Sequence, residues 1–268
     1  RSIVKVSVNL FAAEEGGGGL VFPPIGNLVE WPAYLFEGTF AEFNKIALIS
    51  VLAMAIPAIM FLAAGRDKIP AGLQNIVEGS VDFIDNQVIL PAIGPDGFKF
   101  RPLLISIFFF VFIGNIFEVI PTFQMPMNAR MAAPALLGII VLVVFVVVGV
   151  KSQGLGGYLK SSAGPSGLPK AMYLLVTPIE YLSTFIVRPF SLAVRLFANM
   201  LAGHILLVTF GVLCIALWQA SALVVVLPFS FAMLVALTGF EIMVSFLQGF
   251  VFALLAAVYI GGAMHPHH

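Results

Sequence analysis

The chain has 268 residues, of which 60% are hydrophobic and only 10% are charged, and its formal net charge is zero. This composition, with a mean hydropathy of +1.08, predicts an all-α integral membrane protein without a large soluble domain. No basic cluster indicates nucleic-acid binding, and the single Cys214 excludes an internal disulfide or a multi-cysteine metal site.

A polar N-terminal segment precedes the membrane domain. Residues 1–42 are mixed in character, whereas residues 43–268 are expected to form a single membrane domain. The chain begins with Arg1, and its basic first residues fit a processed targeting segment or a trimmed chain equally well. The first span is predicted over residues 43–65, where Pro57 can kink the helix.

Residues 71–90 have apolar side chains at helical spacing and acidic side chains around the rest of the helix. The apolar residues of this pattern are Ile76, Val77, Val81, Ile84 and Val88. The pattern predicts an amphipathic helix on the membrane surface or against a partner. Because the acids disfavour binding to anionic lipid, a protein partner is favoured.

Two further spans are predicted over residues 101–120 and 134–150. The first carries Asn115 and Glu118 on one face near its end. The loop expected after the second is basic and glycine-rich, with Lys151, Lys160 and Lys170. The sequence has no visible internal repeat, which disfavours transporters built from inverted repeats.

Two overlong apolar segments end the chain. Residues 171–218 would measure about 72 Å as one helix, against a hydrocarbon core of about 30 Å. Residues 222–262 are also too long for a perpendicular span. The first segment must break at Pro178 or Pro189, tilt strongly, or both. The expected fold therefore has five to six helices, including one surface amphipathic helix and two long, strongly tilted C-terminal helices.

Basic residues orient the chain. They flank residues 71–90 and fill the loop before the first overlong segment, whereas the connection at residues 121–133 has only Arg130. The N-terminus is therefore expected outside, and the surface helix and the C-terminus inside. Glu118 then lies near the outer face and Glu180 near the inner face.

An arginine interrupts the first overlong segment. Residues 190–218 are about as apolar as a membrane span, yet they carry Arg195. An arginine near the bilayer centre costs roughly 2.5–3.5 kcal/mol, so it marks a functional site by default. The alternatives are snorkelling to the headgroups or pairing that holds helices together. Asn199 shares a face with Arg195, whereas His204, nine residues on, points to the opposite side.

The last segment carries a polar face formed by Glu241, Ser245 and Gln248. If the two long helices are antiparallel, Gln248 can lie beside Arg195 and Glu241 near His204. His204 and Glu241 can exchange protons near neutral pH, whereas Arg195 keeps its proton and acts as a fixed countercharge. The alternative for the acid–histidine pair is a static contact that pins the two helices.

Three other polar residues can extend this path. Asn115 and Glu118 can feed protons from outside, and Glu180 can release them inside. For Glu118 the alternative is an interfacial carboxylate. For Asn199 and Gln248 it is hydrogen bonding that packs helices.

Two motifs carry a family resemblance. Residues 188–204 have the sequence R-P-F-S-L-A-V-R-L-F-A-N-M-L-A-G-H, which resembles the signature of subunit a of F-type ATP synthases. Residues 241–259 have the sequence E-I-M-V-S-F-L-Q-G-F-V-F-A-L-L-A-A-V-Y, which resembles the family's second signature. The resemblance implies a proton-translocating stator subunit whose two tilted helices curve around a ring of c subunits.

The resemblance also implies roles for particular residues. Arg195 matches the essential arginine that separates an outer from an inner half-channel. Asn199 and Gln248 match its polar neighbours, and Asn115 and Glu118 resemble the pattern of the earlier span. The acid at Glu180, by contrast, is one residue out of step with the family.

The arrangement of His204 and Glu241 resembles the mitochondrial and alphaproteobacterial type, ATP synthase subunit 6. It implies the mitochondrial inner membrane, with a bacterial plasma membrane as the alternative. The implied partners are the c-ring, the peripheral stalk, other membrane stator subunits, lipids and protons. The chain has no glycine-rich phosphate-binding sequence, so we expect a non-catalytic subunit that binds no nucleotide, metal or other cofactor.

Charge placement alone leaves a rival interpretation. A proton-coupled secondary transporter can use Arg195 to hold an anionic substrate. A purely structural membrane anchor explains the overlong helices but not the polar residues within them. Sodium coupling is disfavoured, because the sequence has no clear cluster of oxygen ligands.

Overall fold

The computed structural model describes residues 45–65, 72–120, 123, 125, 127–163, 170–219 and 223–264, which form helices and turns without a strand. The polar segment predicted for residues 1–42 lies outside these ranges. Five helices of the described part are long and apolar enough to cross a membrane. The prediction of an all-α, multi-pass membrane protein is thereby confirmed.

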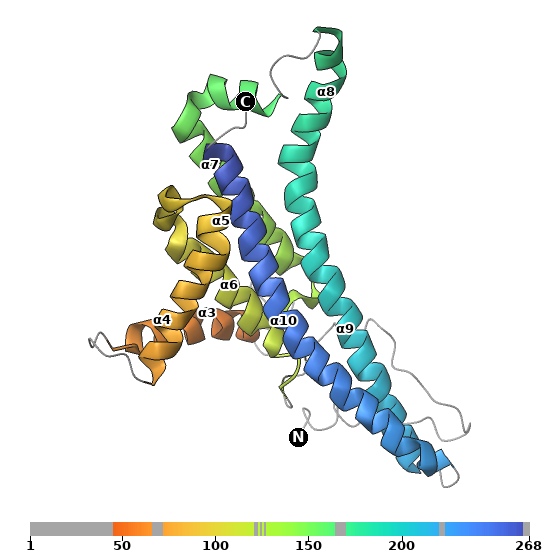
Figure 1. The fold of residues 1–268 in the computed structure, drawn as a ribbon. Helices are drawn as coiled ribbons and strands as arrows, with labels where there is room; N and C mark the ends of the chain where they lie inside the picture. Colours follow the sequence, from red (N-terminus) through yellow and green to blue (C-terminus); the bar gives the residue numbers. More distant parts are fainter. Residues whose placement is uncertain are drawn as a thin grey trace.

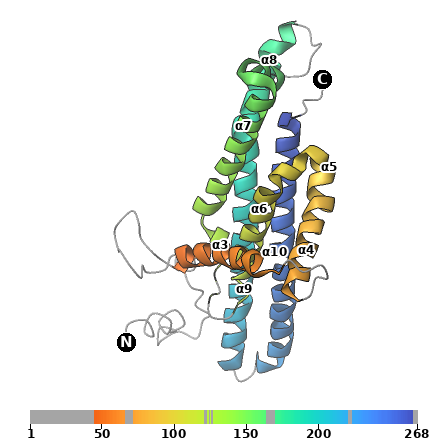
Figure 2. The same cartoon turned by 90° about the vertical axis from the view of Figure 1, so that its left-hand side faces the viewer.

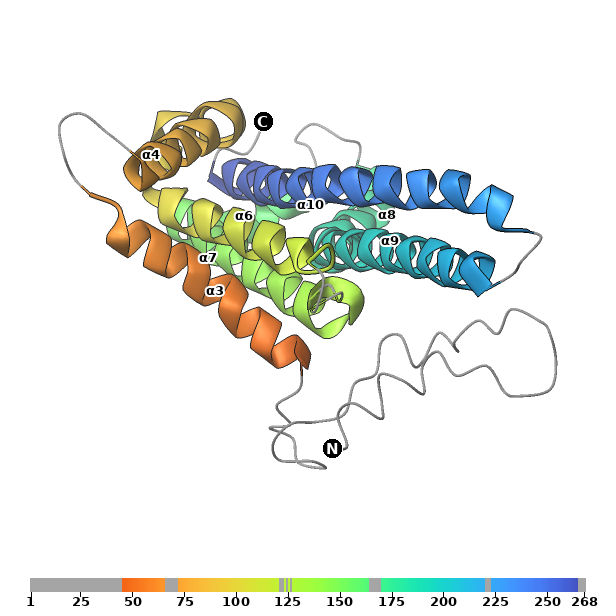
Figure 3. The ribbon, with the colours of Figure 1, turned by 90° about the horizontal axis from the view of Figure 1, so that it is seen from below.

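The earlier helices lie mainly to one side of a long C-terminal pair (Figure 1). In chain order they are α3 (Lys45–Ala63), α4 (Leu73–Ile84), α5 (Leu90–Ala92), α6 (Arg101–Ile116), α7 (Ala132–Ser162), α8 (Lys170–Leu182), α9 (Arg188–Gln219) and α10 (Leu227–Met264). Helix α10 packs against α6, α7 and α9. Seen from below, α9 and α10 run side by side and extend beyond the other helices (Figure 3).

The first overlong segment does not break at its prolines. Helices α8 and α9 are joined by a π-helical turn, Ser183–Val187, into one continuous helix, within which the candidate membrane span Met172–Trp218 has 47 residues. The Arg188 backbone N–H donates to the Ser183 carbonyl, and Pro189 follows directly. A proline removes one backbone donor and crowds the preceding turn, and the wider π turn accommodates both effects.

The helix predicted to lie on the membrane surface also contains a π turn ahead of a proline. A π turn, Asp85–Ile89, joins α4 to α5 directly before Pro91. Val77, Ile84 and Val88 of the predicted apolar face are buried within the chain. Ile76 of the same face is 60% exposed, as expected of a residue that faces lipid or a partner protein.

The connection after the third span is not simply a loop. Helix α7 continues to Ser162, so Lys151 and Lys160 lie on it. Gly154 has φ 75°, a conformation that favours glycine, and here it turns the helical chain sharply. The ring of Tyr158 then packs back against Gly149. The glycines that suggested a loop form a sharp corner at Gly154 and a close packing contact at Gly149.

Side chains near the end of α7 form hydrogen bonds to the C-terminal end of α10. The Gln153 side-chain amide donates to the Ala263 carbonyl at 2.8 Å, and the Ser152 hydroxyl donates to the Met264 carbonyl at 3.2 Å. The Ser161 hydroxyl in turn donates to the side-chain oxygen of Gln153, Oε1, at 2.7 Å. The last carbonyls of a helix have no partner within the helix, so these side chains satisfy the terminus of α10.

Helix α3 runs across the direction of α9 and α10 (Figure 2). Its 19 residues measure about 28 Å, close to a hydrocarbon core of about 30 Å. If α3 is perpendicular to the membrane plane, α9 and α10 are therefore strongly inclined to it. The two long helices fit the membrane by strong tilt rather than by a break.

Close packing of α10 on α5 gives a test of the fold. A Cβ on Gly261 would overlap the Ala92 backbone carbonyl, whereas a Cβ on the exposed Gly262 meets nothing within 4 Å. We expect Gly261→Ala to lower the free energy of unfolding by about 1–3 kcal/mol, and Gly262→Ala to leave it unchanged or slightly raised. Thermal unfolding of the detergent-solubilised protein measures both, and equal midpoints would contradict this packing.

Candidate functional site

Three titratable side chains from different parts of the chain meet in the protein interior. Glu118 follows the end of α6, His204 lies on α9 and Glu241 on α10, and each is at most 5% exposed. His204 Nδ1 lies 3.4 Å from Glu118 Oε1. Glu241 interacts electrostatically with both of the others. The predicted grouping of His204 with Glu241 is present, but the direct contact of the histidine is with Glu118.

A glycine makes room for this cluster. A Cβ built on Gly203 would lie 2.5 Å from the carboxyl carbon of Glu241 and would overlap its oxygens. The carboxyl group of α10 therefore packs directly against the backbone of α9, next to His204. Any larger residue at position 203 must displace that carboxyl group.

Buried polar atoms without a hydrogen-bond partner gather around the same cluster. Within the described residues they are Asn115 Nδ2, Glu118 Oε1 and Oε2, Asn128 Oδ1, Glu241 Oε2 and Ser245 Oγ. An unsatisfied buried polar group costs about 1–3 kcal/mol, and such groups are normally satisfied by ordered water. Their concentration on α6, α10 and the connection after α6 gives the apolar fold one polar interior.

Arg195 lies outside this interior. It is exposed on α9, as is Asn199 one turn later, while Leu196 and Met200 on the other side of the helix are buried. Arg195 is 23 residues from Met172 and 23 from Trp218, the ends of the candidate membrane span. Within the described part of the chain it makes no ion pair or hydrogen bond. The alternative that Arg195 pairs with another helix of this chain is therefore not supported.

The contact of Gly203 with Glu241 fixes how α9 and α10 are aligned. Counting back eight residues on α9 reaches Arg195, and counting on seven residues on antiparallel α10 reaches Gln248. The two side chains therefore lie within about 2 Å of the same level along the pair. Gln248 is buried on α10 and Arg195 is exposed on α9, so the two side chains share a level but not an environment.

A second polar group lies toward the other end of α10. The Arg188 guanidinium lies 5.5 Å from the centroid of the Tyr259 ring, within the range of a cation–π contact. Thr184, one turn earlier, is buried, whereas Glu180 on α8 is partly exposed and contacts no other candidate residue among those described. The structure therefore does not bring Glu180 into the polar interior.

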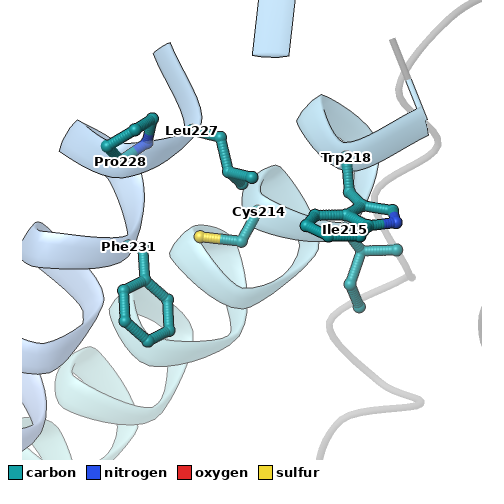
Figure 4. Close-up of a pocket in the computed structure, with 6 residues that line it drawn as sticks. All are labelled: Cys214, Ile215, Trp218, Leu227, Pro228 and Phe231. Carbon is teal, nitrogen blue, oxygen red and sulfur yellow. The ribbon is translucent and has the colours of Figure 1, made fainter. Parts of the chain in front are cut away.

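An apolar hollow lies at the far end of the long pair, near the turn from α9 to α10 (Figure 4). Its volume is about 500 Å³ and it is lined by Cys214, Ile215, Trp218, Leu227, Pro228 and Phe231. These side chains offer no carboxylate or imidazole. The hollow is thus separate in chemistry from the polar interior.

Comparison with known proteins identifies the family. The family model described as ATP synthase A chain matches residues 47–261. The chain belongs to this family. A Frankia alni protein named ATP synthase subunit a is 42% identical over 234 residues, covering 84% of this chain and 79% of the relative. Proteins of the same name from Mesorhizobium japonicum and Rhodococcus erythropolis are 40% and 39% identical over 232 and 240 residues, covering 85% and 87% of this chain and 89% and 87% of the relatives.

The matched range contains every candidate residue of the site. The resemblance to subunit a of ATP synthase is thereby confirmed, and the rival interpretation as a secondary transporter loses its support. The expectation of a mitochondrial protein is not supported, because these three relatives are bacterial.

Two residues of the polar interior in this subunit a homologue were not predicted from the sequence. Gly203 precedes His204 in the motif, and a glycine within a membrane helix is a signal of close packing. Asn128 follows Met127 in the connection after α6, where its hydrogen bond to Asn115 depends on the folded chain. Among the described residues no group of three or more His, Cys, Asp or Glu side chains is placed to hold a metal ion.

The Gly203 contact can be tested with a matched glycine on the same helix. We expect Gly203→Ala to displace the Glu241 carboxyl group and to reduce proton-driven ATP synthesis by about 10- to 100-fold. Gly211→Ala is the control, because a Cβ at that position meets nothing within 4 Å. ATP synthesis in energised membrane vesicles, normalised to the amount of assembled complex, is the measurement. Equal activity of the two variants would show that the contact is unimportant.

Proposed function

We propose that this chain is the non-catalytic, proton-conducting stator subunit of an F-type ATP synthase. The observation that carries the proposal is Arg195, an exposed arginine without a partner in the described chain, at the middle of a 47-residue membrane helix. Such a charge needs a partner outside this chain, since leaving it in hydrocarbon is costly. A carboxylate on a neighbouring ring of c subunits is the partner that fits.

The outer half-channel in this proposal passes through the buried cluster. Glu118, His204 and Glu241 can each take up and release a proton, and unsatisfied polar atoms surround them. Asn115 and Ser245 offer hydrogen-bonding groups along the same path. The cluster therefore supplies protons from the outer face toward the ring.

The inner half-channel is proposed on the other side of Arg195. Arg188 and Tyr259 form a polar contact there, and Thr184 is buried beside them on the preceding turn. Glu180 lies further along α8 and can receive protons near the inner surface. This assignment rests on fewer contacts than the outer path does.

Arg195 separates the two half-channels through its charge. A carboxylate that passes between them as an anion is stabilised in a medium of low dielectric by a fixed cation. The same cation repels protons that would otherwise cross directly. Each elementary charge crossing the membrane is worth about 2.3 kcal/mol per 100 mV, so a direct leak would dissipate the whole driving force. Asn199 lies one turn from the arginine on the exposed side of α9, and the buried Gln248 lies level with it on α10.

The proposed location is a bacterial plasma membrane, in accordance with the bacterial relatives. The N-terminus is placed outside, and α4 and the C-terminus inside, by the distribution of basic residues. The proposed partners are the c-ring, the peripheral stalk, other membrane stator subunits and lipids. Nucleotide binding and catalysis are assigned to other subunits of the complex.

The role of Arg195 is tested by paired measurements. We expect Arg195→Ala to abolish proton-driven ATP synthesis while passive proton flow stays intact or rises, because the barrier between the half-channels is lost. Arg195→Lys should also fail, since an ammonium group is more strongly hydrated and can lose its proton. ATP synthesis and proton leak are measured in the same energised vesicles.

The control for Arg195 is Ser191→Ala, an exposed position one turn earlier on the same helix. It should keep normal synthesis and normal leak. Subunit content is determined first, so that only assembled complexes are compared. Normal synthesis by an assembled Arg195→Ala complex would refute the proposed role.

Coupling within the outer cluster is tested by a double-mutant cycle. We expect His204→Ala and Glu241→Ala each to reduce proton-driven synthesis, and the double variant to lose much less than the product of the two single losses. A shared path explains this, because blocking it twice adds little. Independent effects that multiply, or full activity in both single variants, would argue against a common path.

A further inference from the structure

A buried pair of side-chain amides, Asn128 and Asn115, lies in the polar interior. Asn128 is on a short 3₁₀ turn, Met127–Ala129, and Asn115 is on the last turn of α6. Both side chains are fully buried. Asn128 Nδ2 donates to Asn115 Oδ1 at 2.5 Å. One turn of the connection is thus tied to the end of α6.

The pair lies beside the titratable cluster. Glu118 is three residues after Asn115, and its backbone N–H donates to the Asn115 carbonyl at 3.0 Å. The turn that carries Asn128 packs against α9, the helix of His204, as well as against α6. The two amides therefore adjoin the contact between Glu118 and His204.

Each amide keeps one polar atom free of protein partners in the described residues, namely Asn115 Nδ2 and Asn128 Oδ1. Fixing the turn does not require them, because Met125 and Met127, which precede Asn128, are fully buried and already anchor it. A leucine, which has the same branched shape, would fill the position without bringing an unsatisfied polar atom of its own. The free donor and acceptor together fit ordered water, which needs partners of both kinds.

We propose that Asn128 is a positioning residue of the outer proton path, where with Asn115 it holds the water through which protons reach Glu118. The inference rests on the proposed function and adds a residue to it. An amide neither gains nor loses a proton at physiological pH, so the pair orients the path and the proton is taken up by Glu118.

The test measures passive proton conduction through the membrane part of the complex after its catalytic part has been removed. The complex is in vesicles, where a potassium gradient and valinomycin set the membrane potential that drives proton flow. We expect Asn128→Leu to lower conduction by about 10-fold or more. Asn128→Ser should retain most of it, because a hydroxyl both donates and accepts and leaves room for water. Met127→Leu, a substitution on the same turn, is the control and should conduct normally.

Conduction is normalised to assembled complex. If Asn128→Leu does not assemble, Asn128→Val takes its place with the same criterion. Normal conduction by the apolar variant would overturn the inference, and so would equal losses in Asn128→Ser and Asn128→Leu, which would indicate a purely structural role. An assembled wild-type complex that conducts no protons would instead refute the proposed function itself.

Discussion

The contact between the Gly203 backbone and the Glu241 carboxyl group fixes the alignment of the two long helices. This alignment brings Gln248 level with Arg195 and places Glu241 in the cluster with Glu118 and His204. It also leaves Arg195 on the exposed surface of the helix pair. The proposed separation of the buried proton path from the exposed arginine therefore depends on one close approach between α9 and α10.

Helical phase made much of this arrangement predictable from sequence. The nine-residue spacing predicts opposite directions for Arg195 and His204, and the structure has one exposed and the other buried. The antiparallel pairing of the long segments predicts that Glu241 lies near His204. Both inferences need only the geometry of a single helix and of its neighbour along the chain.

Contacts between elements distant in sequence were not predictable in the same way. The direct contact of His204 with Glu118 joins α9 to the end of α6, and the hydrogen bond of Asn128 to Asn115 depends on how a connection folds back. In the helix at residues 71–90, spacing alone does not tell which apolar residues pack within the chain, as Val77 does, and which stay exposed, as Ile76 does. At Gly154, composition indicated a loop because glycine is common in loops and in sharp corners alike.

The π turn before Pro189 does more than accommodate a proline. It inserts one residue into the helical repeat, so every side chain beyond it is turned relative to those before it. Thr184 is buried within the turn, whereas Ser191 and Arg195 beyond it are exposed. Deleting one residue there would rotate the rest of the helix by about 100° and carry the arginine off its outward-facing side. The π turn thus determines the direction in which the Arg195 side chain points from the helix.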